Sequence, residues 1–246
     1  MSVRSRQAAQ SPRALQSLMP VAPTKPLVLT REVRLPQTLS LSLSASAKRA
    51  FDTALASVGL IISAPLWGLF ALAIKLEDGG PIFYVQERSG LSGTHFTALK
   101  FRSMIPHAEA EVGAVQASEG DPRATRIGRL LRATAMDELP QLWNIFRGDM
   151  SFVGPRALRP GEIELVGDGK VEMLEDVPGF AERCRVRPGL TGIAQIYASR
   201  DIPRHLKFRY DLLYVRRQSF WLDVRLILLS FWITLRGTWE VRGRKF

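Results

Sequence analysis

Hydrophobic residues are densest in residues 53–74, a segment that carries no charged side chain. A helix of this length can span a bilayer, and Pro65 near its middle predicts a kink, because proline lacks an N–H and its ring clashes with the preceding turn. Residues 1–49 are rich in Lys and Arg and nearly free of acidic residues, and a basic region follows residue 74, so neither flank is suited to crossing a membrane. The pattern therefore fits either a re-entrant hairpin or an ordinary spanning helix with a kink.

Shorter periodic segments predict the elements nearest to the candidate chemistry. Residues 82–86 and 94–101 are rich in β-branched and aromatic residues and flank a glycine-containing turn, which predicts a β-hairpin. Apolar residues recur at helical spacing over 139–146, where Pro140 is acceptable in a first turn and Gly148 stands where a C-cap glycine belongs. A short helix is therefore expected between Pro140 and Gly148.

Two later segments are also expected to be helical. Residues 162–175 are acidic and predict a helix on the surface. Residues 219–237 contain an apolar run that is too short to span a bilayer, with tryptophans nearby that suit the head-group region. We expect an amphipathic helix lying on the membrane over this second segment, with a buried core helix as the alternative.

The charge balance favours an anionic partner. The chain of 246 residues contains 34 Lys and Arg against 23 Asp and Glu, a net charge of +11, which suits nucleic acid, an acidic lipid surface or a phosphorylated substrate. The sequence has none of the usual nucleic-acid motifs and no paired Cys/His zinc spacing, so no nucleic-acid partner is expected. Cys184 is the single cysteine, which excludes an intrachain disulfide and fits a structural thiol.

Asp137 and Glu138 are the candidate catalytic pair, since they precede the helix of residues 139–146 among several arginines. An acidic pair at a helix start can simply stabilise the positive end of the helix dipole. A carboxylate fixed there can also act as a nucleophile or bind a divalent cation, and phosphoryl transfer needs cations around the anionic transition state. Arg132 and Arg156 lie close enough in sequence to supply that charge.

Six segments of the chain together resemble the bacterial sugar transferase family, the monotopic phosphoglycosyl transferases. They follow one another in unbroken order over about residues 48–235, which makes a chance match remote. The segments are KRAFD (48–52), EDGGPIFYVQERSG (77–90), KFRSM (100–104), DPRATRIGRLLRATAMDELPQL (121–142), GDMSFVGPR (148–156) and RPGLTGIAQ (187–195).

The resemblance implies an α+β fold that is mainly α. Residues 1–47 are expected to form a disordered basic tail, residues 48–77 a re-entrant membrane helix hairpin kinked at Pro65, and residues 78–246 a compact catalytic domain. This domain would hold a small β-hairpin and surface-lying amphipathic helices at the cytoplasmic face of the bacterial inner membrane. Lys48, Arg49 and Asp52 would mark the membrane interface, where the basic pair can meet anionic lipid phosphates.

The same resemblance implies transfer of a sugar 1-phosphate from a UDP-sugar to polyprenol phosphate, with release of UMP. Asp137 would attack the phosphorus next to the sugar and form a phosphosugar-aspartyl intermediate, and Glu138 would help to bind Mg²⁺. Five basic residues are expected to bind the substrate phosphates; they are Arg132, Arg156, Lys100, Arg88 and Arg102. For the last three, solvated charges at strand ends are the alternative.

Two departures from the family pattern affect substrate recognition more than chemistry. Ala157 stands where a proline is usual, and Ala135 stands where a serine is usual. A different class of function also remains open, a non-enzymatic basic membrane adaptor for a polysaccharide assembly complex, in which the Asp-Glu pair only caps a helix. A homo-oligomer is compatible with the sequence, which leaves the sugar and the polymer undetermined.

Overall fold

The computed structural model describes residues 45–106, 108, 121–165, 171–199 and 202–236 of the chain. Most of the predicted N-terminal tail lies outside the described residues, but its end is already helical from Ala45. The described elements are mainly helices, with three two-stranded sheets, so the expected α+β class with a majority of helix is confirmed.

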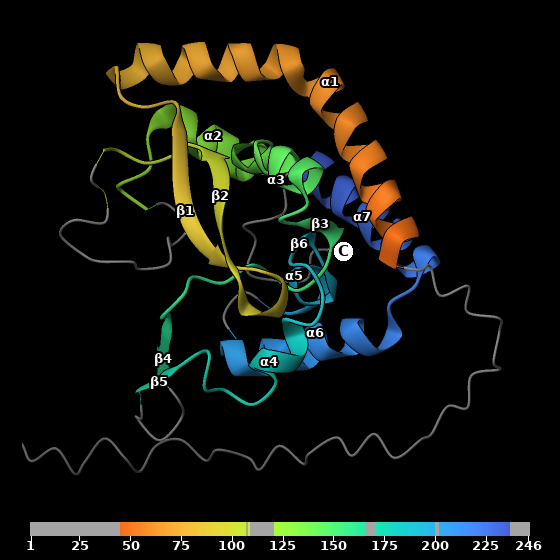
Figure 1. The fold of residues 1–246 in the computed structure, drawn as a ribbon. Helices are drawn as coiled ribbons and strands as arrows, with labels where there is room; N and C mark the ends of the chain where they lie inside the picture. Colours follow the sequence, from red (N-terminus) through yellow and green to blue (C-terminus); the bar gives the residue numbers. More distant parts are fainter. Residues whose placement is uncertain (1–44, 107, 109–120, 166–170, 200–201, 237–246) are drawn as a thin grey trace, which may run out of the picture. The chain divides into compact units, whose positions relative to one another are not determined.

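The apolar segment forms one long helix, α1 (Ala45–Asp78), with Pro65 inside it. Figure 1 shows a pronounced bend near its middle, as a proline that removes a backbone hydrogen bond produces. The segment expected to form a re-entrant helix hairpin kinked at Pro65 is thus one continuous helix with a bend, and its re-entry into the membrane stays a prediction. Among the described residues α1 is the one helix long and apolar enough to cross a membrane, with a mean hydropathy of 2.0 over its most apolar window.

One face of α1 packs on the rest of the protein and the other is exposed. Near its start, Ala56 belongs to a core cluster with Leu142 and Ile145. Near its end, Ile74 packs with residues of the β-hairpin and α2. On the outer face Ile61 and Ile62 are 75% and 73% exposed, which is not how the core helix of a water-soluble domain behaves.

Polar contacts attach both ends of α1 to the same compact unit. At the start, Lys48 Nζ lies 2.6 Å from Asp223 Oδ2. At the end, the Glu77 carboxylate accepts hydrogen bonds from the backbone N–H groups of Arg126 and Ile127. These are free donors in the first turn of the next helix, so Glu77 caps that helix from α1.

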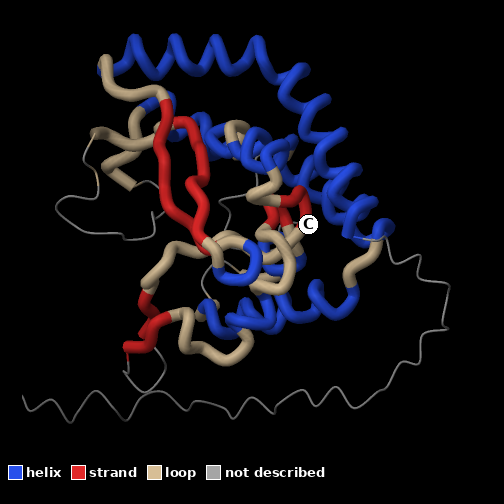
Figure 2. The backbone as a smooth tube through the Cα atoms, viewed as in Figure 1, coloured by secondary structure: helices blue, strands red, loops and turns tan. Residues whose placement is uncertain are grey.

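The predicted β-hairpin is confirmed. Strands β1 (Phe83–Ser89) and β2 (His95–Phe101) pair antiparallel, with Tyr84 opposite Lys100 and Arg88 opposite Phe96 (Figure 2). The short 3-10 turn η2 (Leu91–Gly93) joins them.

Helices α2 (Arg126–Ala133) and α3 (Gln141–Arg147) follow, with the 3-10 turn η3 (Met136–Glu138) between them. The predicted helix end is confirmed, since Gly148 has φ 102° and caps α3. The buried Asn144 side chain donates to Thr97 O and accepts from Leu99 N, which ties α3 to β2.

The remaining core lies around a short parallel sheet. Strands β3 (Ser151–Val153) and β6 (Gly189–Thr191) pair side by side. Helices α4 (Phe180–Arg183), α5 (Ile193–Tyr197), α6 (Arg204–Arg217) and α7 (Phe220–Leu235) complete the described fold. Val153 of β3 packs in one buried cluster with side chains of α5, α6 and α7, so this layer supports the loop that follows β3.

The helix predicted for residues 162–175 is wrong. Strands β4 (Ile163–Leu165) and β5 (Val171–Met173) form an antiparallel pair there. In both strands an acidic residue stands between two apolar ones, and this alternation with a period of two suits a strand better than a helix.

A helix is confirmed over most of residues 219–237, where α7 packs one face on the core and exposes the other. Leu226 and Ile233 are buried in the core, as in a core helix. On its other face Trp221 is 72% and Leu228 64% exposed, and the charged Arg225 is exposed between them. The exposed apolar side chains suit contact with lipid, so the expected helix on the membrane surface stays a prediction.

Candidate active site

The acidic pair lies on its own tight turn between two helices. Asp137 and Glu138 belong to η3, and Ala135 just before them adopts the left-handed conformation with φ 55°. This conformation is unfavourable for a residue with a Cβ atom, and such strain clusters at functional sites. The left-handed conformation of Ala135 reverses the direction of the chain after α2. In the part of the chain that the structure describes, no hydrogen bond joins either carboxylate to the backbone of α3, whose N-cap position is Pro140.

The β-hairpin brings two basic side chains to one face. Residues paired across antiparallel strands share a face, as do residues two apart, so Lys100 and Arg88 project from the same side of the hairpin. Lys100 Nζ pairs with Glu138 Oε1. The hairpin therefore connects the turn η3, which carries Glu138, with the end of β1, which carries Arg88.

Arg156 reaches the site from the loop after β3, and three donors hold that loop. The Arg183 side chain donates to Arg156 O at 2.5 Å, and the Arg88 side chain donates to Ala157 O at 3.0 Å. Ser89 N donates to Leu158 O at 2.8 Å. The backbone from Arg156 to Leu158 is thereby fixed.

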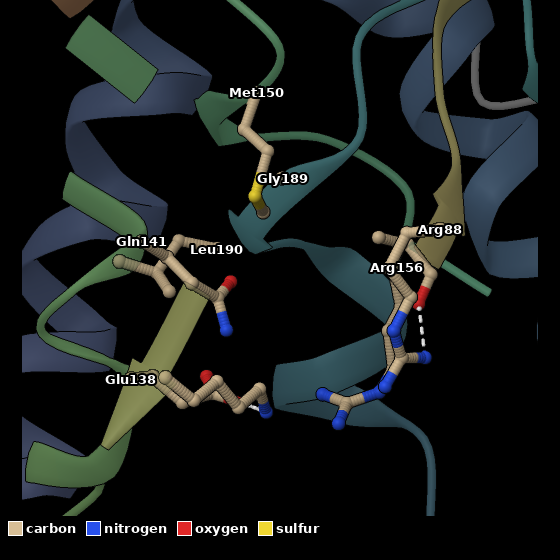
Figure 3. Close-up of a pocket in the computed structure, with 9 residues that line it drawn as sticks. Arg88, Glu138, Gln141, Met150, Arg156, Gly189 and Leu190 are labelled. Carbon is tan, nitrogen blue, oxygen red and sulfur yellow. Dashed lines mark hydrogen bonds and ion pairs between the residues drawn. The ribbon is translucent and has the colours of Figure 1, made fainter. Parts of the chain in front are cut away.

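These elements enclose a pocket of about 290 Å³, part of it open to solvent. Figure 3 shows the Arg88 and Arg156 side chains on one side and Glu138 on the other, with the Gln141 amide pointing into the space between them. Nine residues line the pocket: Arg88, Lys100, Glu138, Gln141, Met150, Arg156, Ala157, Gly189 and Leu190.

The two neighbouring carboxyls differ in their electrostatics. Burial raises the pKa of Asp137 above its usual range, and the nearby cations of Lys100 and Arg132 only partly oppose this effect. Burial acts in the same direction on Glu138, but Lys100, with which it forms an ion pair, and Arg156 outweigh it, so the pKa of Glu138 lies below its usual range. Two carboxyls shifted in opposite directions are typical of catalytic pairs.

The opposite side of the pocket carries excess positive charge. Burial and the adjacent Arg156 lower the pKa of Arg88 to about 10, so Arg88 remains charged at neutral pH. Two guanidinium groups that repel each other in a half-buried pocket are stabilised by an anion between them, and phosphate is the anion that arginine binds best.

The structure brings together most of the predicted phosphate-binding residues but not all of them. Arg88, Lys100 and Arg156 line the pocket, and Arg132 in the last turn of α2 acts electrostatically on Asp137. Arg102 does not line the pocket. Its buried guanidinium pairs with Asp78 at the end of α1. We therefore assign Arg102 a structural contact that closes α1 onto β2.

The predicted membrane-interface residues contact the protein itself. Lys48 pairs with Asp223 of α7, and Asp52 is 2% exposed and accepts from Phe152 N. Arg49 donates to the carbonyls of Ile145 and Phe146 at the end of α3, where a cation is favourable. Pro65 lies exposed at mid-helix in α1. Lipid contact by the basic pair stays a prediction.

Gln141 is the polar pocket residue that sequence reasoning missed. It is the first residue of α3 and lies three residues after Glu138, which places both on one side of a helical turn. That spacing is the signal that could have identified it. Gly189 and Leu190 come from a segment far along the chain, and no local pattern places them beside Glu138.

The residues present suit Mg²⁺. No group of three or more His, Cys, Asp and Glu side chains capable of holding a metal occurs among the described residues. Mg²⁺, however, is commonly held by one or two carboxylates together with substrate phosphates. Glu138 is such a carboxylate, and it lines a pocket together with Arg88 and Arg156, whose guanidinium groups suit phosphate.

Comparison with known proteins gives a consistent result. The model of the family described as bacterial sugar transferase matches residues 43–237. The chain is 43% identical over 190 residues to an undecaprenyl-phosphate glucose phosphotransferase of Komagataeibacter xylinus, which covers 74% of the chain and 35% of that protein. It is 38% identical over 195 residues to the exopolysaccharide production protein ExoY of Rhizobium meliloti, which covers 74% of the chain and 82% of that protein.

A third relative is a UDP-glucose:undecaprenyl-phosphate glucose-1-phosphate transferase of Caulobacter vibrioides, 40% identical over 187 residues, with 74% of the chain and 67% of that protein covered. The chain thus spans about a third of the length of the Komagataeibacter protein but most of the Rhizobium protein. The matched part includes every residue that lines the pocket.

Proposed function

Because the chain belongs to the bacterial sugar transferase family, we propose that it transfers a sugar 1-phosphate from a UDP-sugar to undecaprenyl phosphate and releases UMP. This would be the first membrane step in the synthesis of an exopolysaccharide or another glycoconjugate. The observation that carries the proposal is the pocket in which the Lys100–Glu138 pair faces Arg88 and Arg156, next to Asp137. The names of the relatives from Komagataeibacter and Caulobacter support the same reaction.

The first chemical step assigns Asp137 as nucleophile. Its carboxylate oxygen attacks the phosphorus next to the sugar, a new O–P bond forms, and the bond to the UMP oxygen breaks with its electron pair leaving on UMP. A carboxylate whose pKa burial has raised is more basic than an exposed one, which suits this role. Arg88 and Arg156 hold non-bridging phosphate oxygens and stabilise the charge that develops on them.

In the second step a phosphate oxygen of undecaprenyl phosphate attacks the same phosphorus. The Asp137 oxygen leaves, which restores the carboxylate and yields the lipid diphosphate-sugar. Glu138 supplies carboxylate oxygens of the kind Mg²⁺ prefers, and the bound ion would neutralise the diphosphate and the departing UMP. Lys100 keeps Glu138 ionised and in place through their ion pair.

We further propose that α1 enters the cytoplasmic leaflet of the inner membrane and returns to the same face. Its exposed apolar face, its bend and the attachment of both ends to one compact unit support this arrangement. A site held at the membrane surface can meet the acceptor phosphate at the head-group level without extracting the lipid.

The adaptor hypothesis gains no support from the site. It requires the Asp-Glu pair to serve as a helix cap, whereas Glu138 pairs with Lys100 across the pocket. It also gives no reason for two arginines, Arg88 and Arg156, to line one pocket.

The test is UMP release from a panel of UDP-sugars in detergent or vesicles, with and without polyprenol phosphate and with Mg²⁺ or a chelator. The purified protein should release UMP in near-stoichiometric amount without acceptor and turn over with it, and mass spectrometry should find the sugar phosphate on Asp137. Asp137→Asn should show neither. Glu87→Gln, an exposed carboxylate on β1, is the matched control and should retain activity. Turnover by Asp137→Asn without an adduct would refute the proposal.

A further inference from the structure

Gln141 is a mostly buried residue whose amide reaches the pocket and has no partner among the described residues. The residue is 5% exposed, and its side chain makes no hydrogen bond to any residue that the structure describes. Its amide points into the pocket between Glu138 and the two arginines (Figure 3). The fully buried side-chain atoms without a partner among the described residues do not include those of Gln141, so its amide is accessible from the pocket and free to bind a ligand there.

Asn144, one turn further along α3, shows the contrast. It is also buried, but its amide is fully engaged: it donates to Thr97 O at 2.7 Å and to Asp149, and it accepts from Leu99 N at 3.0 Å. Asn144 therefore has a structural role on the face of α3 that packs on β2. Gln141, with the same chemistry and no contact of this kind, faces the pocket.

The surrounding charges indicate which ligand group the amide meets. Arg88 and Arg156 on the other side select an anion, and phosphate oxygens only accept hydrogen bonds. The amide of Gln141 offers two N–H donors from the side that also carries Glu138. Because Asp137 and Glu138 lie within one turn of Gln141, the nearest phosphate is the one that Asp137 attacks.

We propose that Gln141 contacts the substrate, donating a hydrogen bond to a non-bridging oxygen of the transferred phosphate from the side opposite Arg88 and Arg156. The proposal rests on the proposed function of this site. A neutral donor holds the phosphate in place there without adding a cation, which would make the Asp137 carboxylate less basic and a weaker nucleophile. Gln141 is then a third contact that fixes the phosphorus for in-line attack.

The experiment compares Gln141→Met, which keeps the length and loses the amide, with Gln141→Glu, which keeps the shape but only accepts. Loss of one donor to a transition-state anion should lower kcat/KM by on the order of 100-fold in Gln141→Met. Gln141→Glu should lose more, because its carboxylate repels the phosphate. Inhibition by UMP, which lacks the transferred phosphate, should change by less than about 2-fold in Gln141→Met, since no contact to UMP is removed.

Gln218→Met is the matched control, because Gln218 has a partner in Tyr214 and lies outside the pocket. It should keep the wild-type kcat/KM. Should Gln141→Met fail to fold, Gln141→Asn replaces it, with a shorter amide that also loses the contact and the same expected loss of kcat/KM.

Three results would overturn the assignment. The first is an unchanged kcat/KM in Gln141→Met or Gln141→Asn. The second is an active Gln141→Glu beside an inactive Gln141→Met, which would mean that the amide accepts a hydrogen bond from a sugar hydroxyl. The third is a loss of UMP binding in Gln141→Met that parallels the loss of kcat/KM. A wild-type protein that releases no UMP from any UDP-sugar would instead mark failure of the proposed function itself.

Discussion

Asp137 and Glu138 are adjacent in sequence, yet their surroundings shift their pKa values in opposite directions. Only the ionised form of Asp137 is a nucleophile. We therefore predict that kcat/KM falls as pH decreases through the raised pKa of Asp137, at a pH above the value of 3.8 for an ordinary aspartate. Lys100→Met should move this acid limb to still higher pH, because the Lys100 cation lowers the pKa of Asp137. A pH profile of UMP release checks both; a limb that moves to lower pH would contradict the assignment.

The same shift makes a prediction about stability. A carboxyl with a raised pKa in the folded state binds more protons when folded, so its contribution to the free energy of unfolding decreases as pH rises from its unfolded pKa through its folded pKa. Above that range the ionised, buried carboxylate lowers the free energy of unfolding by a constant amount, which is the cost of its burial. Asp137→Asn removes it, so this inactive variant should be at least as stable as the wild type at pH 7, as measured by thermal unfolding in detergent. A clearly lower Tm would mean that the carboxylate is structural.

Arg183 holds the Arg156 loop from within the core. Its guanidinium lies 2.8 Å from Asp211, and the two side chains are 3% and 4% exposed. Burial raises the pKa of Asp211 in spite of this partner, so Arg183→Met would leave an expensive unpaired carboxylate. We expect a loss of about 3 to 5 kcal/mol in the free energy of unfolding. Arg216→Met, which breaks the exposed pair with Glu182, should change it little. Equal effects in denaturant titrations would contradict this account.

Among the elements, α2 is placed by a close backbone approach. A Cβ atom on Gly128 would lie 2.0 Å from Ser103 O, so α2 can rest on the end of the hairpin only with glycine at this position. Alanine normally stabilises a helix interior relative to glycine by about 1 kcal/mol. We predict that Gly128→Ala instead destabilises the protein and lowers kcat, because α2 and Arg132 are displaced from Asp137.

Gly68 of α1 is the matched control for this substitution. No atom lies within 4 Å of a Cβ placed there, so Gly68→Ala should be neutral or slightly stabilising. Unfolding and UMP release measured on both variants test the contact. If Gly128→Ala were as active and stable as Gly68→Ala, the close approach of α2 to Ser103 would not be needed for stability or activity.

For the molecule as a whole, the attachment of α1 decides the topology. Lys48 at one end contacts α7, and Glu77 at the other caps α2, both within one compact unit. Single cysteines introduced at Ser46 and at the exposed Pro81 should therefore react with a membrane-impermeant maleimide from the same side of sealed vesicles. Cys184 gives little background, since it is buried and burial raises the pKa of its thiol. Labelling from opposite sides would show that α1 spans the bilayer.

The sequence by itself determined the local features of this protein. The charge-free run with Pro65, the β-hairpin around its glycines and the helix ending at Gly148 depend on neighbouring residues only, so periodicity and turn residues predicted them. The family was recognisable for the same reason, because its motifs are short and local. Where local signals compete, as in residues 162–175, the acidic composition was misleading and the alternation of apolar residues was the better guide.

Only the tertiary structure decided which residues meet. Arg102 follows Lys100 by two residues and is equally basic, yet it closes α1 onto β2 through Asp78 while Lys100 faces Glu138. Gln141 and Asn144 are both buried amides of one helix, and the packing of α3 on β2 alone makes one structural and leaves the other facing the pocket. Burial and charge pairing depend on contacts between segments far apart in sequence, and these contacts set the pKa of Asp137 and the exposure of Gln141.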